Sequence, residues 1–203
     1  MAHRRHREQA SVAGKAAAGA REVLRLHVTL LDTDPPVWRD VNVDSGIPLD
    51  RFHDVLQRLM GWTDSHLHQF IVGRKPVYYG VPDPEGLGPK TLDEQSVRIQ
   101  EVLPRKGSTI LYEYDFGDSW IHEIRVDEVS PRPGEFPGPS CEGGARACPP
   151  EDCGGAGGYA EFLDALRDPK HERHTELLEW IGGEFDPEAF DPGRTNRALR
   201  RLR

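Results

Sequence analysis

Two runs of alternating polar and apolar residues meet at a short Gly-Asp turn near the middle of the chain, and this pattern constrains the fold more than any other. The runs are ILYEYDF, residues 110–116, and SWIHEIRV, residues 119–126. Alternation with a period of two is typical of half-buried strands, and glycine at the first of two turn positions is typical of a type II′ hairpin. The chain is therefore expected to contain an antiparallel sheet.

A two-residue loop at Gly117-Asp118 would set the register of this hairpin. The pairs on one face would be Asp115 with Trp120, Glu113 with His122, and Leu111 with Ile124. The other, more apolar face would carry Tyr112, Tyr114, Phe116 and Ile121. A bulge at Gly117 would shift every pair by one residue and exchange the two faces of one strand.

The rest of the chain carries signals for further strands and helices. Alternation predicts strands over residues 23–31, 37–43 and 66–73. Helical spacing, capping residues and terminal glycines predict helices over residues 48–60, 91–102, 159–167, 172–181 and 193–202. Pro- and Gly-rich loops are expected over residues 76–89 and 130–158. We expect a flexible basic tail over residues 1–20 and one α+β domain over 21–203, with a largely antiparallel sheet, packed helices and a long loop before the C-terminal helices.

Charge is distributed unevenly along the 203 residues. The net charge is −8, with +4 over residues 1–21 and +5 over residues 194–203, which leaves −17 for the middle. An acidic body is a poor general surface for nucleic acid, whereas the basic ends either contact DNA or an acidic partner or are simply solvated. No stretch approaches the roughly 20 apolar residues that span a bilayer, and no secretory signal is present, so we expect a cytoplasmic protein without a membrane partner.

His66 and His68 are the first candidate metal ligands. They are separated by one residue on a predicted strand, so both imidazoles should leave the same face. Neutral imidazoles spaced in this way converge on one metal ion in many proteins. The alternative interpretation is that both are polar residues packed at a strand end.

The predicted hairpin gathers further nitrogen and oxygen donors, namely Glu113, Asp115, Asp118 and His122. Aspartate together with histidine suits zinc or another divalent metal ion, or an acid/base pair in catalysis. A structural alternative exists here as well, because Asp118 can shape the turn and Asp115 can accept backbone hydrogen bonds near it.

Cys141, Cys148 and Cys153 lie within 13 residues of one another, and the chain has no other cysteine. An odd number argues against a disulfide framework and indicates metal binding, redox chemistry or a structural loop. Structural zinc sites use four ligands with short spacers, so a distant histidine such as His171, His66 or His122 would have to complete one. Alternatively, Glu151 and Asp152 precede a helix and stabilise its positive end.

Motifs of established nucleophile and phosphate chemistry are missing from the sequence. It contains no GxSxG elbow, no GxxxxGK[ST] loop and no GxGxxG after a strand. A thiol nucleophile paired with a histidine has no local signature either. The candidate catalytic residues are therefore the acids and the histidine of the two central motifs, Asp115, Asp118, His122, Glu151 and Asp152.

Seven motifs occur in a fixed order along the chain. They are Trp38-Arg39, Met60-Gly61-Trp62, His66-x-His68-x-Phe70, Tyr112-x-Tyr114-Asp115-Phe116-Gly117-Asp118-x-Trp120-x-His122, Cys141-x-Gly143-Gly144, Pro149-Pro150-Glu151-Asp152-x-Gly154-Gly155-x2-Gly158-Tyr159 and Phe185-Asp186-Pro187-Glu188-x-Phe190-Asp191. Together they closely resemble the plasmid pRiA4b ORF-3-like family, from about Val23 to Arg197. The resemblance implies an α+β domain found on plasmids, insertion elements and bacterial chromosomes.

Members of this family are often labelled as insertion-sequence passengers or TnpR-type resolvases. The residues give that label no chemical support, because Ser11 is the only serine among the first 40 residues and Tyr159 is the last tyrosine. A serine recombinase needs an activated N-terminal serine, and a tyrosine recombinase needs a late tyrosine. Recombination is therefore not expected.

Three functions are compatible with these patterns. The first is a binding or accessory module tied to mobile DNA. The second is a metal-dependent, hydrolase-like enzyme that uses His66, His68, Asp115, Asp118 and His122 around a divalent ion such as zinc. The third is a structural interaction domain in which the glycines of the two motifs are backbone requirements and the tryptophans form the core.

Overall fold

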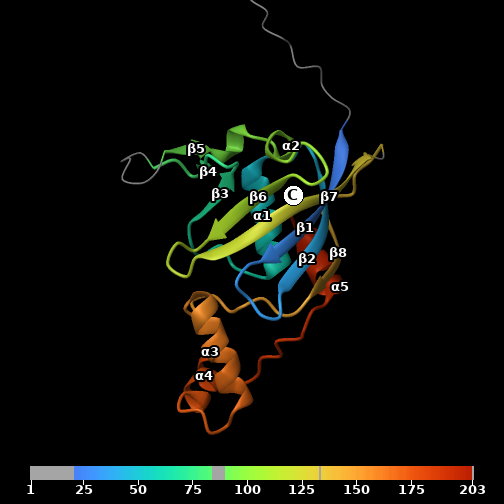
Figure 1. Cartoon of the computed structure of the whole chain (residues 1–203). Coiled ribbons are helices and arrows are strands. Elements are labelled where there is room, and N and C mark those ends of the chain that lie inside the picture. Colours follow the sequence, from blue (N-terminus) through green and yellow to red (C-terminus); the bar gives the residue numbers. More distant parts are fainter. Residues whose placement is uncertain (1–20, 84–89, 133, 203) are drawn as a thin grey trace, which may run out of the picture.

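The computed structural model describes residues 21–83, 90–132 and 134–202, and it contains one eight-stranded sheet with the order β5-β4-β3-β6-β7-β1-β2-β8 (Figure 1). Neighbouring strands are antiparallel except for the parallel pair β4 and β5. The strands are β1 (Glu22–Leu30), β2 (Val37–Asp44), β3 (His68–Val72), β4 (Val77–Gly80), β5 (Thr91–Asp93), β6 (Thr109–Tyr114), β7 (Trp120–Pro131) and β8 (Ser140–Ala145). The helices are α1 (Leu49–Met60), the 3-10 helix η1 (Glu94–Ser96), α2 (Ile99–Val102), α3 (Gly155–Arg167), α4 (His174–Ile181) and α5 (Pro192–Leu199). The predicted α+β fold is confirmed.

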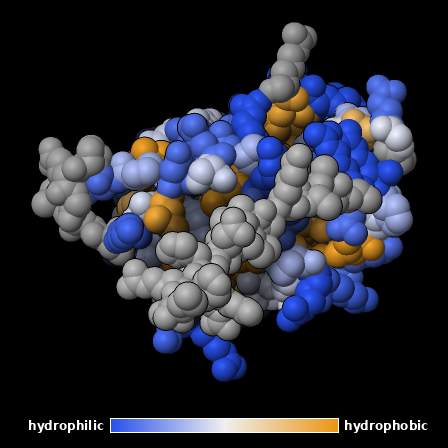
Figure 2. Space-filling model, turned by 90° about the horizontal axis from the view of Figure 1, so that it is seen from above, coloured by the Kyte–Doolittle hydropathy of each residue, from blue (hydrophilic) through white to orange (hydrophobic). Residues whose placement is uncertain are grey.

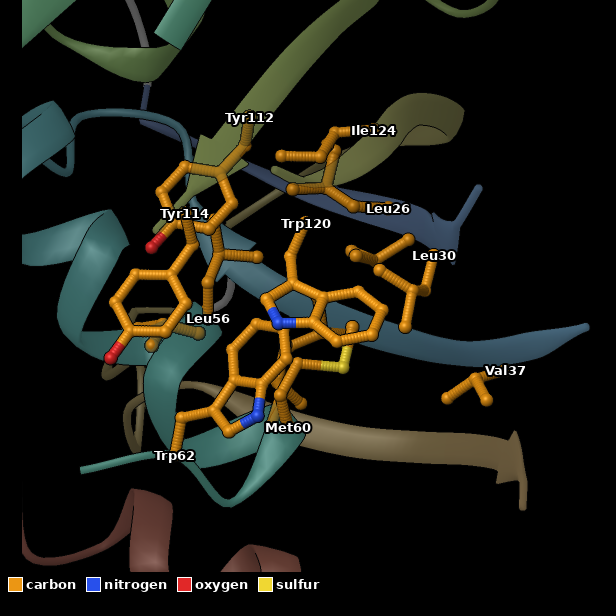
Figure 3. Close-up of a cluster of buried hydrophobic side chains, with 14 of the residues drawn as sticks. Leu26, Leu30, Val37, Leu56, Met60, Trp62, Tyr112, Tyr114, Trp120 and Ile124 are labelled. Atoms are coloured by element: carbon orange, nitrogen blue, oxygen red, sulfur yellow. The ribbon is translucent and has the colours of Figure 1, made fainter. Parts of the chain in front are cut away.

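Helix α1 lies against the centre of the sheet and forms the core with it. Its apolar residues recur at helical spacing, so one face of the helix is buried, and Gly61 ends it in the left-handed conformation as its position predicts. Figure 3 shows Leu56 and Met60 of this helix beside Tyr114 and Trp120 of the sheet. Burial of each such side chain stabilises the fold by roughly 1.5–3 kcal/mol.

The central hairpin is present, but the predicted register is wrong by one residue. Tyr112 pairs with His122 and Tyr114 pairs with Trp120, so all four side chains lie on the buried face. The connection is a five-residue loop over 115–119 instead of two residues. This register places both tyrosines and the tryptophan in the core together, which removes more apolar surface from water than the predicted pairing.

The left-handed backbone of Asp115 and Ser119 explains the longer loop. Both have positive φ, at 59° and 54°, and the Ser119 amide donates a hydrogen bond of 2.6 Å to the Asp115 carbonyl. Asp115 therefore belongs to the loop and does not share a sheet face with His122. The Gly-Asp pair predicts the turn, but it does not reveal that residues on either side of it also leave the strands.

Three other segments differ from the predictions. The loop predicted over residues 76–89 contains β4, and the helix predicted over 91–102 is divided into β5, η1 and α2. The capping interaction lies further along the chain than predicted, where Glu101 accepts the Arg98 amide at 2.8 Å. The loop predicted over 130–158 holds the end of β7 and all of β8, and α3 begins four residues early, at Gly155. The predicted tail over residues 1–20 lies outside the described residues.

The C-terminal third of the chain leaves the sheet and returns to it. Helices α3 and α4 project away from the sheet, and α5 comes back beside β8 (Figure 1). The side-chain amide of Asn196 in α5 bonds both the amide and the carbonyl of Cys141 in β8, each at 2.8 Å. This contact fixes α5 against the last strand of the sheet.

Hydrophilic residues cover most of the coloured surface seen from above, with apolar residues in small separate areas (Figure 2). In the described part of the chain no helix is both long and apolar enough to cross a bilayer.

Candidate functional site

The loops of the two central motifs, residues 115–119 and 147–154, lie against each other although they are far apart in sequence. The Asp118 carboxylate accepts the Gly154 amide at 3.1 Å, and the Tyr114 hydroxyl donates to Glu151 at 2.6 Å. A Cβ on Gly155 would stand 2.5 Å from the Asp118 carbonyl oxygen, and the φ of Gly155 is +67°. Only glycine permits this approach, so Gly155 sets the distance between the two loops.

A histidine and two carboxylates converge where these loops meet the segment before β3, and we call His66, Asp115 and Asp152 the open group. The His66 Nε2 atom lies 3.1 Å from an Asp152 oxygen and 3.7 Å from an Asp115 oxygen. Neither approach has hydrogen-bond geometry, and the buried Nε2 atom has no hydrogen-bond partner among the described residues. One nitrogen and two carboxylate oxygens, all able to bind a metal ion, therefore lie close together without hydrogen bonds between them.

The distances in the open group match those around a metal ion. Zinc binds nitrogen and carboxylate oxygen at about 2.0–2.2 Å, so two ligands at a tetrahedral angle stand about 3.3–3.5 Å apart. The observed 3.1 and 3.7 Å bracket that value. Asp115 and Asp152 both hold left-handed backbone conformations, with φ of 59° and 60°, a geometry that costs energy and that occurs often at ligand sites.

The other two carboxylates of these loops already accept hydrogen bonds from neighbouring residues. Glu151 accepts hydrogen bonds from Tyr114 and from the backbone amide and hydroxyl of Thr63, the last at 2.5 Å. Asp118 holds the Gly154 amide. These two acids therefore position the loops, and the three residues of the open group remain as the donors directed toward a common point.

A second set of histidines and carboxylates lies nearby, and we call His53, Asp64, His68 and Glu94 the closed group. The two imidazole rings stack with their centroids 3.5 Å apart. His53 Nε2 bonds Asp64 at 2.9 Å, and His68 Nε2 bonds Glu94 at 3.0 Å. All four residues of the closed group line a groove of about 530 Å³, and His66 is the member of the open group that also lines it.

The hydrogen bonds of the closed group form a ring whose directions are fixed. The Asp64 amide can only donate, so the Gln57 atom that it meets at 3.0 Å is the oxygen, and the Gln57 nitrogen donates to the Tyr112 hydroxyl at 3.1 Å. That hydroxyl then donates to His53 Nδ1 at 2.8 Å, and His53 Nε2 donates to Asp64. Burial, and next the neighbouring His68, lower the pKa of His53, so a neutral imidazole completes the ring.

His122 does not reach either group. It is fully buried beside Trp62 and Tyr112, and burial lowers its pKa to about 4. Its Nδ1 atom makes one long contact of 3.3 Å with the Tyr112 carbonyl. A neutral imidazole sealed in the core is a packing residue at neutral pH.

The three cysteines are free thiols. Cys141 is buried on β8, and Cys148 and Cys153 follow in the next loop. Burial raises the pKa of all three, and that of Cys153 to about 12, so these sulfur atoms stay protonated at neutral pH. None of them belongs to a close set of three metal-binding side chains within the described ranges.

The structure thus brings three of the predicted site residues together, His66, Asp115 and Asp152, and places Asp118 and Glu151 beside them. His68 joins the closed group instead. Sequence reasoning missed His53, Asp64 and Glu94. The available signal was the spacing of Asp64, His66 and His68, which alternate along one short segment that leads into β3 and belong to the two groups in turn.

A third close set, His27, Asp40 and Asp127, lies on the sheet. Here the carboxylates have cationic partners, because Arg25 lies 3.6 Å from Asp40 and Arg125 lies 2.9 Å from Asp127. His27 also bonds Asp40 directly at 2.6 Å. The set is an ion-pair network in which the histidine and both carboxylates already have partners.

Comparison with known proteins agrees with this fold and with the order of the motifs. The pattern that defines the plasmid pRiA4b ORF-3-like proteins matches residues 22–194. The chain belongs to this family. The resemblance of the seven motifs is therefore confirmed, and the pRiA4b ORF-3-like match covers both the open and the closed group.

Two relatives place the family match in context. The chain is 43% identical over 180 residues to the uncharacterized protein y4hQ of Sinorhizobium fredii (strain NBRC 101917 / NGR234), covering 87% of this chain and 90% of that protein. The crystal structure of a protein of unknown function, MM3350 from Methanosarcina mazei Go1, is similar with a TM-score of 0.75 and 34% identity, covering 85% of this chain and 96% of the other. The fold of this chain is thus shared with the Methanosarcina mazei protein.

Proposed function

We propose that the protein is a binding module for a divalent transition metal ion, held by His66, Asp115 and Asp152. One observation carries this proposal: the buried His66 Nε2 atom faces two carboxylate oxygens at 3.1 and 3.7 Å without forming a hydrogen bond. A nitrogen and two oxygen donors suit zinc, manganese or iron. The same set includes three residues that the sequence predicts as metal or catalytic candidates.

The exposure of the open group on one side means that an ion bound there would keep free coordination positions. Asp152 is 71% exposed, so one side of the group is open to solvent. Water bound to zinc at such a position ionises near pH 7 and becomes a nucleophile. A metal-dependent hydrolase is therefore the second candidate function, and the adjoining groove of the closed group would receive its substrate.

The position of the protein in the cell is part of the same proposal. The three cysteines are free, and free thiols persist in reducing compartments. This supports a cytoplasmic protein that acts as a binding or accessory module.

Zinc and manganese titration of the purified, untagged protein tests the metal site. Wild type should bind one equivalent and melt at a higher temperature with the metal, and Asp152→Asn should bind at least tenfold more weakly. Asparagine tolerates the left-handed backbone, so the variant removes charge without adding strain. Asp118→Asn is the matched control, because its side chain can still accept the Gly154 amide and it lies outside the open group.

The control also accounts for zinc that binds to the other histidines of the chain instead of to the open group. Equal affinity in wild type, Asp152→Asn and Asp118→Asn contradicts the proposed site, as does the absence of any tight equivalent in wild type. Hydrolysis is tested separately with zinc-loaded protein on ester and phosphodiester substrates. Hydrolytic activity that survives in Asp152→Asn would reject the hydrolase function. The metal site would still be decided by the titration.

A further inference from the structure

A second groove, of about 830 Å³, lies between the end of α1, the following turn and α5, away from both histidine groups. Four exposed arginines line it: Arg58, Arg194, Arg197 and Arg201. The whole chain carries a net charge of −8, so this is a local concentration of positive charge on an acidic protein. Such a surface attracts anions even where the net charge repels them.

The charges of these arginines are largely unpaired within the protein. Asp191 is the one acid that lines the groove, and it pairs with Arg197 at 3.5 Å. Arg58, Arg194 and Arg201 form no ion pair within 4 Å of a described acid. Arg173, elsewhere on the surface, is by contrast held by Glu161 and Glu176 at 2.9 and 2.8 Å.

A buried cation forms the floor of the same groove. Arg39 is 3% exposed, and its guanidinium donates only to backbone carbonyls, those of Trp38, Leu59, Ala145 and Arg146, at 2.7–3.2 Å. The ring of Phe190 lies 4.3 Å from its central carbon. No described carboxylate bonds Arg39, so its positive charge adds to that of the groove above it.

The arrangement of the exposed arginines favours an extended ligand over a single small anion. Arg194, Arg197 and Arg201 follow each other at spacings of three and four residues, which places them along one side of α5 and the turn after it. Seven residues of helix rise by about 10 Å, so the row is longer than one phosphate group. Arginine is the side chain best suited to phosphate, because its planar fork donates two parallel hydrogen bonds.

From these observations we propose that the groove binds the phosphate backbone of a single-stranded nucleic acid. The strand lies along α5 with its phosphates on Arg194, Arg197 and Arg201, and Arg58 contacts it from the opposite wall. A groove of about 830 Å³ between two helices admits a flexible strand more readily than a rigid duplex. This activity is separate from metal binding, because the two sites share no residue.

Fluorescence anisotropy with a labelled 12-nucleotide single strand and the full-length protein tests the groove. Three to four phosphate contacts predict that affinity falls about 20- to 50-fold between 50 and 200 mM salt. The variant Arg58→Glu/Arg201→Glu should bind at least tenfold more weakly than wild type. The control, Arg74→Glu/Arg105→Glu, changes net charge by the same amount at exposed arginines outside the groove and should stay within threefold.

Melting temperatures of both variants verify folding, and Arg58→Gln/Arg201→Gln repeats the test with a milder change. Equal loss in the groove variant and the control would show that only net charge matters, and would overturn the proposal. It would be overturned equally by no binding at 50 mM salt, or by inorganic phosphate binding the groove while the strand does not. None of these three outcomes affects the metal titration, in which nucleic acid is absent.

Discussion

The open and the closed group contain the same kinds of side chain, yet they differ in what their atoms do. In the closed group, His53 and Asp64 complete a ring with Gln57 and Tyr112 in which each donor meets an acceptor. In the open group, His66 faces two carboxylates without hydrogen-bond geometry. The closed group is therefore a structural element of the core, whereas the open group has unused coordination capacity. Residue types alone do not distinguish these roles.

The largest predicted effect concerns pH and His122, which is buried in the core beside Tyr112. The pKa of His122 is about 4 in the folded protein and about 6.5 in an unfolded chain. Between these values the unfolded chain binds a proton that the folded one does not, so stability falls as pH falls from 6.5 toward 4. The loss is about 3 kcal/mol at pH 4.

Urea unfolding at pH 7.0, 5.5 and 4.5 measures this loss. His122→Phe retains the packing volume and removes the titrating group, so its stability should fall less steeply with acid than that of wild type. Parallel pH profiles for the two proteins would mean that His122 does not titrate on unfolding. His53, whose pKa is also lowered, contributes in the same direction in both proteins.

The next effect breaks the ring of the closed group. His53→Ala leaves the Tyr112 hydroxyl and Asp64 without their bonds to the imidazole, and a buried unsatisfied group costs about 1–3 kcal/mol. We expect a loss of about 2–3 kcal/mol in the free energy of unfolding, with zinc affinity unchanged within threefold. Weakened zinc binding in a folded variant would show that the two groups act as one site.

Gly155→Ala disturbs the open group from a distance. The added methyl would meet the Asp118 carbonyl at 2.5 Å, so the two loops must separate. Overpacking of this kind costs about 1–3 kcal/mol, and we expect about 2 kcal/mol together with at least tenfold weaker zinc binding. Gly157→Ala is the control within the same helix, because no atom lies within 4 Å of its added methyl. Unchanged affinity in Gly155→Ala would mean that loop spacing does not hold the metal.

The smallest effect distinguishes the two groups most sharply. His66→Ala removes no hydrogen bond, so without metal its stability should change by less than about 0.5 kcal/mol. With zinc present, only wild type should gain melting temperature. A large loss of stability in the metal-free variant would instead assign the open group a structural role like that of the closed one.

Local patterns predicted much of the fold. The alternation in β1 and β2, and the helical spacing that ends at Gly61, gave the correct elements. The register of the central hairpin was wrong because the backbone of Asp115 and Ser119 leaves the strand, and neither residue type requires this. The conformation of a loop depends on what packs against it, which a short pattern does not contain.

The candidate site was predicted in part, for a related reason. His66, Asp115 and Asp152 were each selected as candidates, but their convergence depends on Gly155 bringing two distant loops together. His53 was missed because it lies on the buried, mostly apolar face of α1, where a histidine gives no sign of its partners. Tyr112, whose hydroxyl donates a hydrogen bond to His53, is more than 50 residues away in sequence.

The bond between Asn196 and Cys141 has a consequence for how the molecule meets its own copies. A strand at the margin of a sheet offers its amides and carbonyls to any extended segment, including one from a second molecule. At Cys141 the carboxamide of Asn196 supplies both a donor and an acceptor, as the backbone of an additional strand would. At this edge of the sheet α5 thus occupies, through one side chain, the place where a strand of another copy would pair with β8.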